Sequence, residues 1–517
     1  MPIRIRPDRN RSPQQQRHSS NSNSRRSSGG GILGAVLPLA LNLFKKNPKL
    51  GIIALIAFGI YYWYSSKSEG NSTVNTLIEQ VFSTGMNMDE KVYDKAEVFE
   101  ALADNIKNPL PEEVSLLAYA PSRKNQGKQG SCVGWASAYA ARTILYAKQT
   151  GAEPNRVRFS PSFVYNQIAL KNCQGSYMHK AMDVMLNRGA LPYSAFAYDE
   201  NSCSNKPDGR EIEQAKQFKT KGFNRLTKSG DNYKTDLLAI KQNLSQGAPV
   251  VIGMMVGGSF MTQMNGRKVW KPTRSDYQQR GFGGHAMCVI GYDDYLEGGA
   301  FQIMNSWGEK WGEKGIFWIK YNDFDHFTKE AYGLYPMGDA KAVETTRLKG
   351  ELGIQVQANG KYLAFDKQTD IGFSSRQRLT KQADFKIEIT NSLECYTYII
   401  GEETDGSSYV LFPYTKKHSP YCGITGTRLF PKDHSLYPDD VGSKDQFAVI
   451  ISKQKLDYKA LNSEINAANG SNFEQKIKRA MGTELISGTD LFDGETIAFD
   501  SKNGNGNMIA IVLEINK

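Results

Sequence analysis

The pattern of apolar positions divides the chain into a mixed region of helices and strands and a strand-rich region. After Ser131 and Cys132, apolar and small residues recur every three or four positions, at Trp135, Ala136, Tyr139, Ala140, Thr143, Ile144 and Ala147. This spacing predicts a helix that begins near Cys132 and ends before Gly151. Farther along, the apolar runs at residues 287–292 and 315–321 predict strands.

From about Arg347 the pattern changes to short strand-like runs separated by Gly, Asn and Asp turns. The runs cover residues 353–356, 385–389, 395–400, 409–412, 447–451 and 508–513. Many short strands separated by such turns are typical of an all-β sandwich. Residues 461–480 are interpreted as helical insertions.

The N-terminal part changes composition abruptly. Residues 1–30 are rich in Arg, Ser, Asn, Gln and Gly, with almost no apolar residue after Ile5. Such a segment cannot bury a core, and we expect a disordered tail. Residues 31–44 are then largely apolar, and residues 50–64 are apolar without a charge and end in an aromatic cluster.

Three interpretations of the apolar residues 31–64 stay open: a membrane anchor, a cleaved signal peptide and a buried core helix. Basic residues before the second apolar run and aromatic residues at its end favour the anchor. The same rules predict a cytoplasmic tail and place everything after Tyr64 on the non-cytoplasmic side, in the periplasm or outside the cell. Residues 65–109 are expected to be a linker, a short pro-segment or a packing helix.

The net charge of +11 is concentrated in the tail. Residues 1–49 hold ten Lys and Arg residues and one acid, Asp8, so the other residues are close to neutral overall. No basic motif interleaved with aromatic residues occurs, and we expect no nucleic-acid partner. The histidines and cysteines show none of the spacings of a zinc site, so neither a metal nor a cofactor is implied.

Four polar residues in separate segments supply the parts of a cysteine acyl-transfer site: Gln126, Cys132, His285 and Asn305. A free thiol has a pKa of about 8.5, and a helix N-terminus at Cys132 would favour the thiolate. We expect His285 to take the thiol proton and return it to the leaving amine, and Asn305 to orient the imidazole. Gln126 lies six positions before Cys132 and would form the oxyanion hole with the Cys132 N–H.

The segments around these residues resemble the papain-like cysteine peptidases. Gln126 and Cys132 keep the spacing of that family, and residues 283–287 match its Gly-His-Ala block. Residues 305–312 match the motif Asn-Ser-Trp-Gly-x-x-Trp-Gly at every fixed position. The resemblance covers residues 110–337 and implies a helical lobe that carries the thiol and a β lobe that carries the imidazole and the amide.

The resemblance also implies which residues contact substrate in the cleft between the lobes: Gly175, Ser176, Gly284 and Trp307. Ser176 departs from the family, which has a second glycine there, and its Cβ is expected to lie where the peptide binds. Trp307 is expected to shield the pair formed by His285 and Asn305 from water.

The cysteines other than Cys132 fall into three groups. Cys173 and Cys203 match family half-cystines whose usual partners are missing here, so the resemblance predicts that they bond to each other. Cys395 and Cys422 are a second candidate pair. Cys288 lies in an apolar run and is expected to be buried and inert.

Together these features predict an α+β protein with five parts: a disordered tail at 1–30, membrane segments at 31–64, a linker at 65–109, a papain-like domain at 110–340 and a β-sandwich at 347–517. We expect a membrane-anchored cysteine endopeptidase that hydrolyses proteins or peptides. The β-sandwich resembles accessory domains of bacterial multidomain proteins and would bind a protein partner or brace the enzyme. Two alternatives are an acyltransferase that uses the same site and a non-catalytic scaffold in a cell-envelope assembly.

Overall fold

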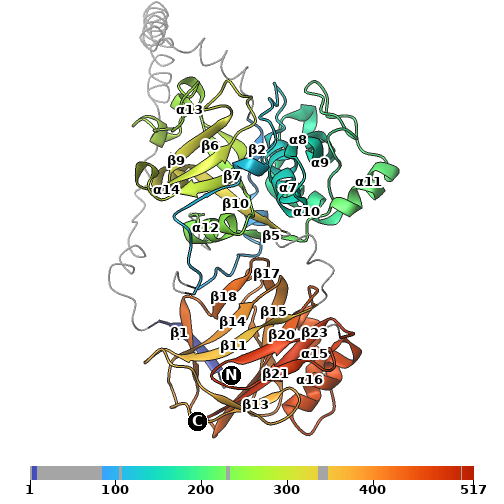
Figure 1. Cartoon of the computed structure of the whole chain (residues 1–517), viewed down its shortest axis with the longest axis vertical. Helices are drawn as coiled ribbons and strands as arrows, with labels where there is room; N and C mark the ends of the chain where they lie inside the picture. Colours follow the sequence, from blue (N-terminus) through green and yellow to red (C-terminus); the bar gives the residue numbers. More distant parts are fainter. Residues whose placement is uncertain (1–2, 9–83, 104–106, 229–232, 336–346, 502–503) are drawn as a thin grey trace, which may run out of the picture. The chain divides into compact units, whose positions relative to one another are not determined.

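The computed structural model describes residues 3–8, 84–103, 107–228, 233–335, 347–501 and 504–517 (Figure 1). Residues 3–8 and the described residues from 84 onward belong to one compact unit. The predicted membrane segments at 31–64 therefore lie outside the described residues. Within the described ranges, no helix combines the length and the apolar character needed to cross a membrane.

The helical lobe is built around the helix that was predicted to begin at Cys132. It starts as α6 (Cys132–Gly134), continues as a π-helical stretch (Trp135–Arg142) and ends as α7 (Thr143–Thr150). Gly151 ends it in a left-handed conformation with φ of 69°, which glycine adopts without steric cost. The other helices of this lobe are α8 (Pro154–Val157), α9 (Pro161–Ile168), α10 (Met178–Asn187) and α11 (Gly209–Ala215).

The β lobe is an antiparallel sheet whose strands lie in the order β5, β10, β6, β7, β8 and β9, with β3 paired to β7. Their bounds are β3 (Glu113–Ser115), β5 (Gly222–Arg225), β6 (Val250–Val256), β7 (Gly283–Asp293), β8 (Ala300–Met304), β9 (Ile316–Lys320) and β10 (Thr328–Tyr335). The helices α12 (Leu237–Ser245), α13 (Gly258–Thr262) and α14 (Tyr321–Phe327) accompany this sheet. The strands predicted at 287–292 and 315–321 are confirmed as β7 and β9.

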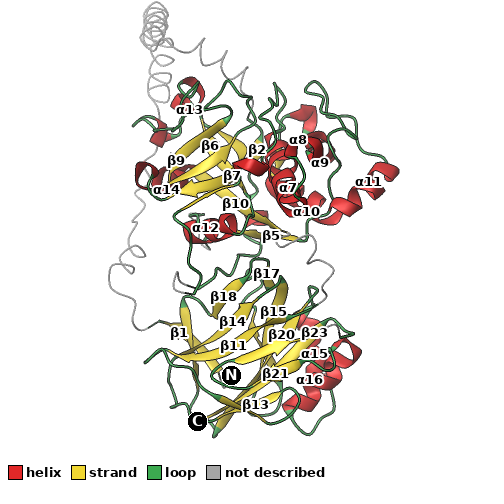
Figure 2. Cartoon of the chain, in the orientation of Figure 1, coloured by secondary structure: helices red, strands yellow, loops and turns green. Residues whose placement is uncertain are grey.

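The β-rich region after residue 347 consists of two sheets that share one hydrophobic core (Figure 2). The first contains β11 (Lys349–Val356), β14 (Phe385–Asn391), β18 (Gly426–Phe430), β19 (His434–Pro438), β21 (Asp490–Phe492) and β22 (Ile497–Asp500). The second contains β12 (Phe365–Lys367), β13 (Gly372–Ser375), β15 (Cys395–Glu402), β16 (Ser408–Phe412), β17 (Tyr421–Cys422), β20 (Lys444–Ser452) and β23 (Met508–Asn516).

All six strands predicted in this region are present. The helical insertions predicted at 461–480 correspond to α15 (Tyr458–Ala467) and α16 (Phe473–Met481). Cys395 and Cys422 lie opposite each other on β15 and β17, but both are free thiols, so the second candidate disulfide is not formed.

The N-terminal residues add a strand to the first sheet of the β-rich region. Strand β1 (Ile3–Pro7) pairs antiparallel with β19 over five residues, and Ile3 is buried in the shared core. The prediction of a disordered tail at 1–30 is therefore wrong at residues 3–7. The prediction relied on the overall polar composition of thirty residues. Within them Ile and Arg alternate locally, and alternation with a period of two is typical of a strand with one buried face.

Backbone hydrogen bonds join β1 and β19, so residues 3–7 are part of the β-rich region. The predicted localisation, with the tail in the cytoplasm and everything after Tyr64 on the non-cytoplasmic side, stays a prediction.

Residues 84–103 form a strap that runs along the β lobe. In the sequence they precede residues 110–337, the region that resembles the papain-like peptidases. It contains the two-residue strand β2 (Met86–Asn87) and the short helix α5 (Glu90–Tyr93). Tyr93 is buried, and its hydroxyl contacts Thr227 Oγ1 at 2.8 Å and accepts from the Ala331 N–H at 3.0 Å. Farther on, the Val98 N–H donates to the carbonyl of Lys417 in the β-rich region. The strap is thus held by buried and backbone contacts.

Candidate active site

Cys132 is the first residue of its helix, as predicted, with Ser131 as the N-cap residue. The first N–H groups of a helix have no partner within the helix and make its N-terminus electropositive. The thiol has no exposed surface. It lies within hydrogen-bond reach of the backbone of Ala286, which is the neighbour of His285 on β7. The fold therefore brings the thiol of the helical lobe beside the strand of the β lobe that carries His285.

His285 and Asn305 are joined by a hydrogen bond between Nε2 and Oδ1 at 2.8 Å. The Ser306 N–H also donates to Asn305 Oδ1, at 2.7 Å, which identifies this atom as the amide oxygen. Because Oδ1 can only accept, the Nε2 atom of His285 carries the proton of the neutral ring. The other nitrogen, Nδ1, is then the basic one, and it has no hydrogen-bond partner among the described residues.

Trp307 covers this pair. Its ring stacks on the imidazole of His285 with centroids 4.4 Å apart and 24° between the planes. Trp307 is itself buried, as is Trp311, which packs against it edge-on. Trp307 was predicted both to shield the pair and to contact substrate, and its position on the imidazole is the one expected of a shield.

Gln126 is fully buried, and its side-chain amide is fixed at both ends. Its Oε1 accepts from the Ser306 hydroxyl at 2.6 Å, and its Nε2 donates to the Gln129 carbonyl at 2.9 Å. Ser306 therefore contacts both Gln126 and Asn305, which the sequence motif alone did not reveal.

Residues 84–87 of the chain itself lie beside Cys132, in the groove predicted to bind substrate. The Ser176 N–H donates to the Gly85 carbonyl at 2.8 Å, and the Gly85 N–H donates to the Gly284 carbonyl at 3.2 Å. Strand β2 pairs in parallel with β4 (Ser176–Tyr177). Two predicted substrate contacts, Ser176 and Gly284, thus bind the backbone of this segment.

The glycines of the groove allow this close approach. A Cβ on Gly175 would lie 2.4 Å from the Gly85 carbonyl oxygen, and one on Gly284 would lie 2.3 Å from the Met86 carbonyl oxygen. The expected obstruction by Ser176 does not occur. Its hydroxyl turns away and donates to the Ile168 carbonyl at 3.1 Å, so only its backbone faces the groove.

Met86 places its side chain in a pocket on the β lobe. A Cβ on Gly253 would lie 2.5 Å from Met86 Cε, and one on Gly284 would lie 3.2 Å from it. The two glycines therefore leave room for the Met86 side chain. Met178 Sδ lies at the same wall, 3.1 Å from the position of a Cβ on Gly253. The sequence analysis missed this pocket, because its walls come from three segments that no local pattern connects.

Burial shifts both titrating groups of the site toward their neutral forms. It raises the pKa of the Cys132 thiol to about 12, against opposing backbone hydrogen bonds from Ala286, Val133 and Gly85. It lowers the pKa of His285 to about 4, although the hydrogen bond with Asn305 acts in the opposite direction. At neutral pH the covered site therefore holds a thiol and a neutral imidazole.

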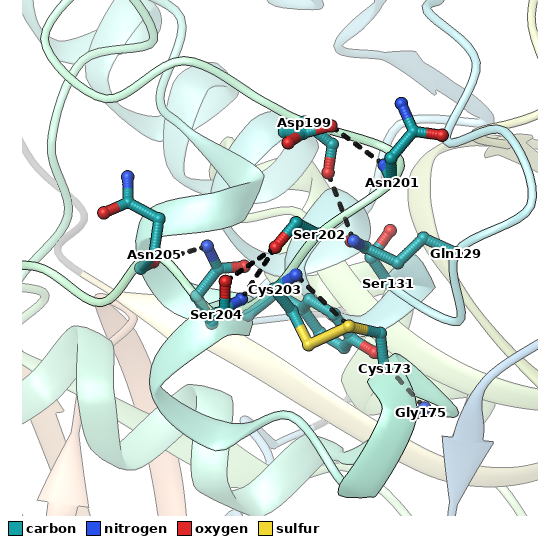
Figure 3. The surroundings of a disulfide bond; sticks show 12 residues. Gln129, Ser131, Cys173, Gly175, Asp199, Asn201, Ser202, Cys203, Ser204 and Asn205 are labelled. Carbon is teal, nitrogen blue, oxygen red and sulfur yellow. Dashed lines mark hydrogen bonds between the residues drawn. A yellow bond between two sulfur atoms is a disulfide. The ribbon is translucent and has the colours of Figure 1, made fainter.

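Cys173 and Cys203 form the predicted disulfide, which ties the loop before β4 to residues 199–205 (Figure 3). Gln129 stands where the family has another half-cystine. Its Nε2 donates to the Asp199 carbonyl at 3.1 Å and so joins the same loop by a hydrogen bond. Cys288 is buried on β7, and burial raises the pKa of its thiol, as expected for an inert residue.

Comparisons with known proteins agree with this geometry. The family model described as papain family cysteine protease matches residues 115–337. An uncharacterized peptidase C1-like protein of Acanthamoeba polyphaga mimivirus is 31% identical over 217 residues, which cover 40% of this chain and 67% of the viral protein. The chain belongs to the papain family of cysteine peptidases.

Other relatives of this papain-family chain match over a smaller share of their length. Cathepsin K of Gallus gallus is 30% identical over 209 residues, which cover 40% of this chain and 56% of cathepsin K. Xylellain, a cysteine protease from Xylella fastidiosa, aligns by structure with a TM-score of 0.41 and 21% identity, over 50% of this chain and 97% of xylellain. The chain thus spans about two thirds of the viral relative and little more than half of the avian one.

Proposed function

We propose that the chain is an exported endopeptidase that cleaves protein or peptide substrates through a thioester on Cys132. His285 Nδ1 takes the thiol proton as the sulfur attacks the substrate carbonyl, and the imidazolium then protonates the leaving amine. His285 next removes a proton from water, which hydrolyses the thioester. The observation that carries this proposal is the hydrogen bond from His285 Nε2–H to Asn305 Oδ1, because it leaves Nδ1 as the basic nitrogen of the ring.

Gln126 and the backbone N–H of Cys132 are proposed to stabilise the oxyanion of the tetrahedral intermediates. The fixed orientation of the Gln126 amide supports this role, because its oxygen accepts from Ser306 and its nitrogen is the donating end. Ser306 is proposed as a positioning residue, since it contacts both this amide and Asn305.

The groove is proposed to bind an extended substrate backbone through the Ser176 N–H and the Gly284 carbonyl. These are the groups that now bond to Gly85. The pocket that Met86 fills is proposed to accept an apolar substrate side chain, because its walls include Met178 and two glycines. Gly175 contributes by leaving room for the backbone.

The described form is proposed to be latent. Residues 84–87 occupy the groove, and Cys132 and His285 have no exposed surface. Activity then requires that this segment leaves, after which solvent reaches the site. The desolvation that raises the pKa of Cys132 and lowers that of His285 would decrease, and the thiolate form would become accessible.

The disulfide between Cys173 and Cys203 supports export, because such bonds persist in oxidising compartments. Attachment to a membrane through residues 31–64 remains a proposal. Because β1 pairs with β19, a chain segment that enters the membrane must also return to the peptidase side. Protease added to intact cells is expected to reach both an epitope at residue 1 and the peptidase domain; a protected epitope would contradict this arrangement.

The test of the catalytic proposal is labelling with a peptidyl epoxide that alkylates a cysteine paired with a histidine. After the groove is opened by proteolysis before residue 110, the wild-type protein is expected to gain one inhibitor mass at Cys132. Cys132→Ala and His285→Ala should gain none. Labelling of His285→Ala at the wild-type rate would contradict the paired mechanism. Neither the family match nor the geometry supports the acyltransferase or scaffold alternatives.

A further inference from the structure

The edge of β19 is bound by a segment that belongs to a distant part of the sequence. Residues 3–8 belong to the same compact unit as the β-rich region. All five residues of β1 pair with β19, from Ile3 opposite Pro438 to Pro7 opposite His434. The segment is therefore joined to this surface by its own backbone pairing.

The first specific contact is made by Ile3. Its side chain is 1% exposed and lies in the core that the two sheets share, whereas Ile5 on the same strand is 42% exposed. The Ile3 N–H donates to the hydroxyl of Tyr409, which is on β16 of the opposite sheet, at 3.2 Å. Ile3 thus inserts between the two sheets.

The second contact is made by Arg6. Its Nε donates to Asp384 Oδ1 at 2.6 Å, and its guanidinium lies 4.1 Å from the centre of the Tyr437 ring. The side chains of Arg6 and Asp384 are only 20% and 12% exposed. A planar guanidinium suits a site that combines a carboxylate and an aromatic face, which a lysine would fit less well.

The third contact is made by Asp8. It accepts from Lys386 Nζ at 2.9 Å and from the Ser435 hydroxyl at 2.6 Å. The side chain of Lys386 is 4% exposed, so its charge depends on nearby acceptors. The carboxylate of Asp8 is one of the acceptors that stabilise the buried charge of Lys386.

We infer that the edge of β19 is a peptide-binding site that recognises an apolar-x-x-Arg-x-acidic segment by strand addition, with residues 3–8 of this chain as its occupant. Backbone pairing gives affinity, and the Ile3, Arg6 and Asp8 positions give specificity. The site is independent of the peptidase chemistry. Its consequence is that the N-terminal part of the chain stays bound to the β-rich region when the chain is cut between residues 9 and 81.

The first experiment uses the full chain with a protease recognition sequence inserted between residues 65 and 81. After cleavage, in detergent, the N-terminal fragment is expected to co-elute with the remainder in size-exclusion chromatography. Arg6→Glu should release it, and Arg6→Glu combined with Asp384→Arg should restore retention. Retention that is unaffected by Arg6→Glu, or release from the wild-type protein, would overturn the inference.

The second experiment tests binding in trans with a labelled peptide of residues 1–9. The full chain carrying Arg6→Glu, whose own segment is weakened, is expected to bind this peptide at least 10-fold more tightly than the wild-type chain does. An Ile3→Ser peptide should bind about 10- to 100-fold more weakly, on the scale of losing one buried aliphatic side chain, while an Ile5→Ser peptide should bind nearly as well as the original. Equal binding of the two serine peptides would overturn the inference.

Discussion

Gly85 lies so close to Gly130 that a Cβ on Gly85 would come within 2.2 Å of the Gly130 carbonyl oxygen. No flexible side chain can relieve this clash, because the obstructing atom is backbone. The contact joins the strap at residues 84–103 to the loop that precedes Cys132. A glycine at position 85 is therefore a requirement of the covered site.

The first prediction follows from that contact. Gly85→Ala should displace residues 84–87 and expose the thiol, so alkylation of Cys132 by iodoacetamide at pH 7.5 should be at least about 10-fold faster than in the wild-type protein, since thiolate character and access both increase. Mass spectrometry of the Cys132 peptide measures this rate. Gly209→Ala is the matched control, because a Cβ there meets nothing within 4 Å. Equal rates in the two variants would argue against a covering segment.

The second prediction concerns Gln126. In protein with an opened groove, Gln126→Ala should lower kcat/KM. The loss should correspond to about 2–4 kcal/mol of transition-state stabilisation, the scale for loss of one oxyanion donor. Ser306→Ala removes only the hydroxyl that holds the Gln126 oxygen, so its effect should be smaller. Thermal unfolding of both variants separates lost activity from lost stability. A larger effect at Ser306 than at Gln126 would mean that the amide is not the donor.

The third prediction concerns Asn305. Asn305→Ala should lower kcat/KM by about 10- to 100-fold, because the imidazole loses its orientation while the bond-making groups stay in place. Trp307 also stacks on the ring and limits its movement. The stronger effect of Cys132→Ala, which removes the nucleophile, is the reference. Wild-type kcat/KM in Asn305→Ala would show that Trp307 alone orients His285.

Much of the site is readable in the sequence because its signals are local. The helix that begins at Cys132 is predicted by the spacing of its own apolar residues, and the motif at 305–312 identifies the residues that follow Asn305 in the chain. The covering segment gives no such signal. Strand β2 has two residues, and the partners of the segment, Ser176 and Gly284, lie about a hundred and two hundred positions away from it.

The N-terminal strand was missed for a related reason. Only Ile3 and Ile5 distinguish β1 from the polar residues that follow, and the strand depends on β19, which is more than four hundred residues distant. The two-sheet region was easier to predict, since runs such as 447–451 are continuous and apolar. Its resemblance to accessory domains of bacterial proteins stays a prediction.

The fourth prediction concerns the pH dependence of stability. Glu330 is buried near Tyr93, and burial raises its pKa from an ordinary value of 4.5 to about 8, against the opposing charge of Arg225. Between these two pH values the folded protein binds more protons than the unfolded chain does. Stability should therefore fall as the pH rises from 4.5 to 8.

Glu330→Gln removes this titration. Its melting temperature should equal that of the wild-type protein near pH 4.5 and exceed it at pH 9 by about 3–6 °C, on the scale of 1–2 kcal/mol for a domain of this size. Differential scanning fluorimetry at both pH values provides the measurement. Glu351→Gln, at an exposed position on β11, should leave both melting temperatures unchanged. A variant less stable than wild type at pH 9 would show that Glu330 is needed in its charged form.

The most direct test of the account is the hydrolysis of a fluorogenic peptide by full-length Met86→Asp. A charge at position 86 cannot be accommodated in the apolar pocket formed with Met178, so the segment should leave the groove. The initial rate should then exceed that of the wild-type chain by at least about 10-fold, because free Cys132 can react, and should fall to background in Met86→Asp combined with Cys132→Ala. Equal rates for the wild-type chain and Met86→Asp, or hydrolysis that persists without Cys132, would contradict the account.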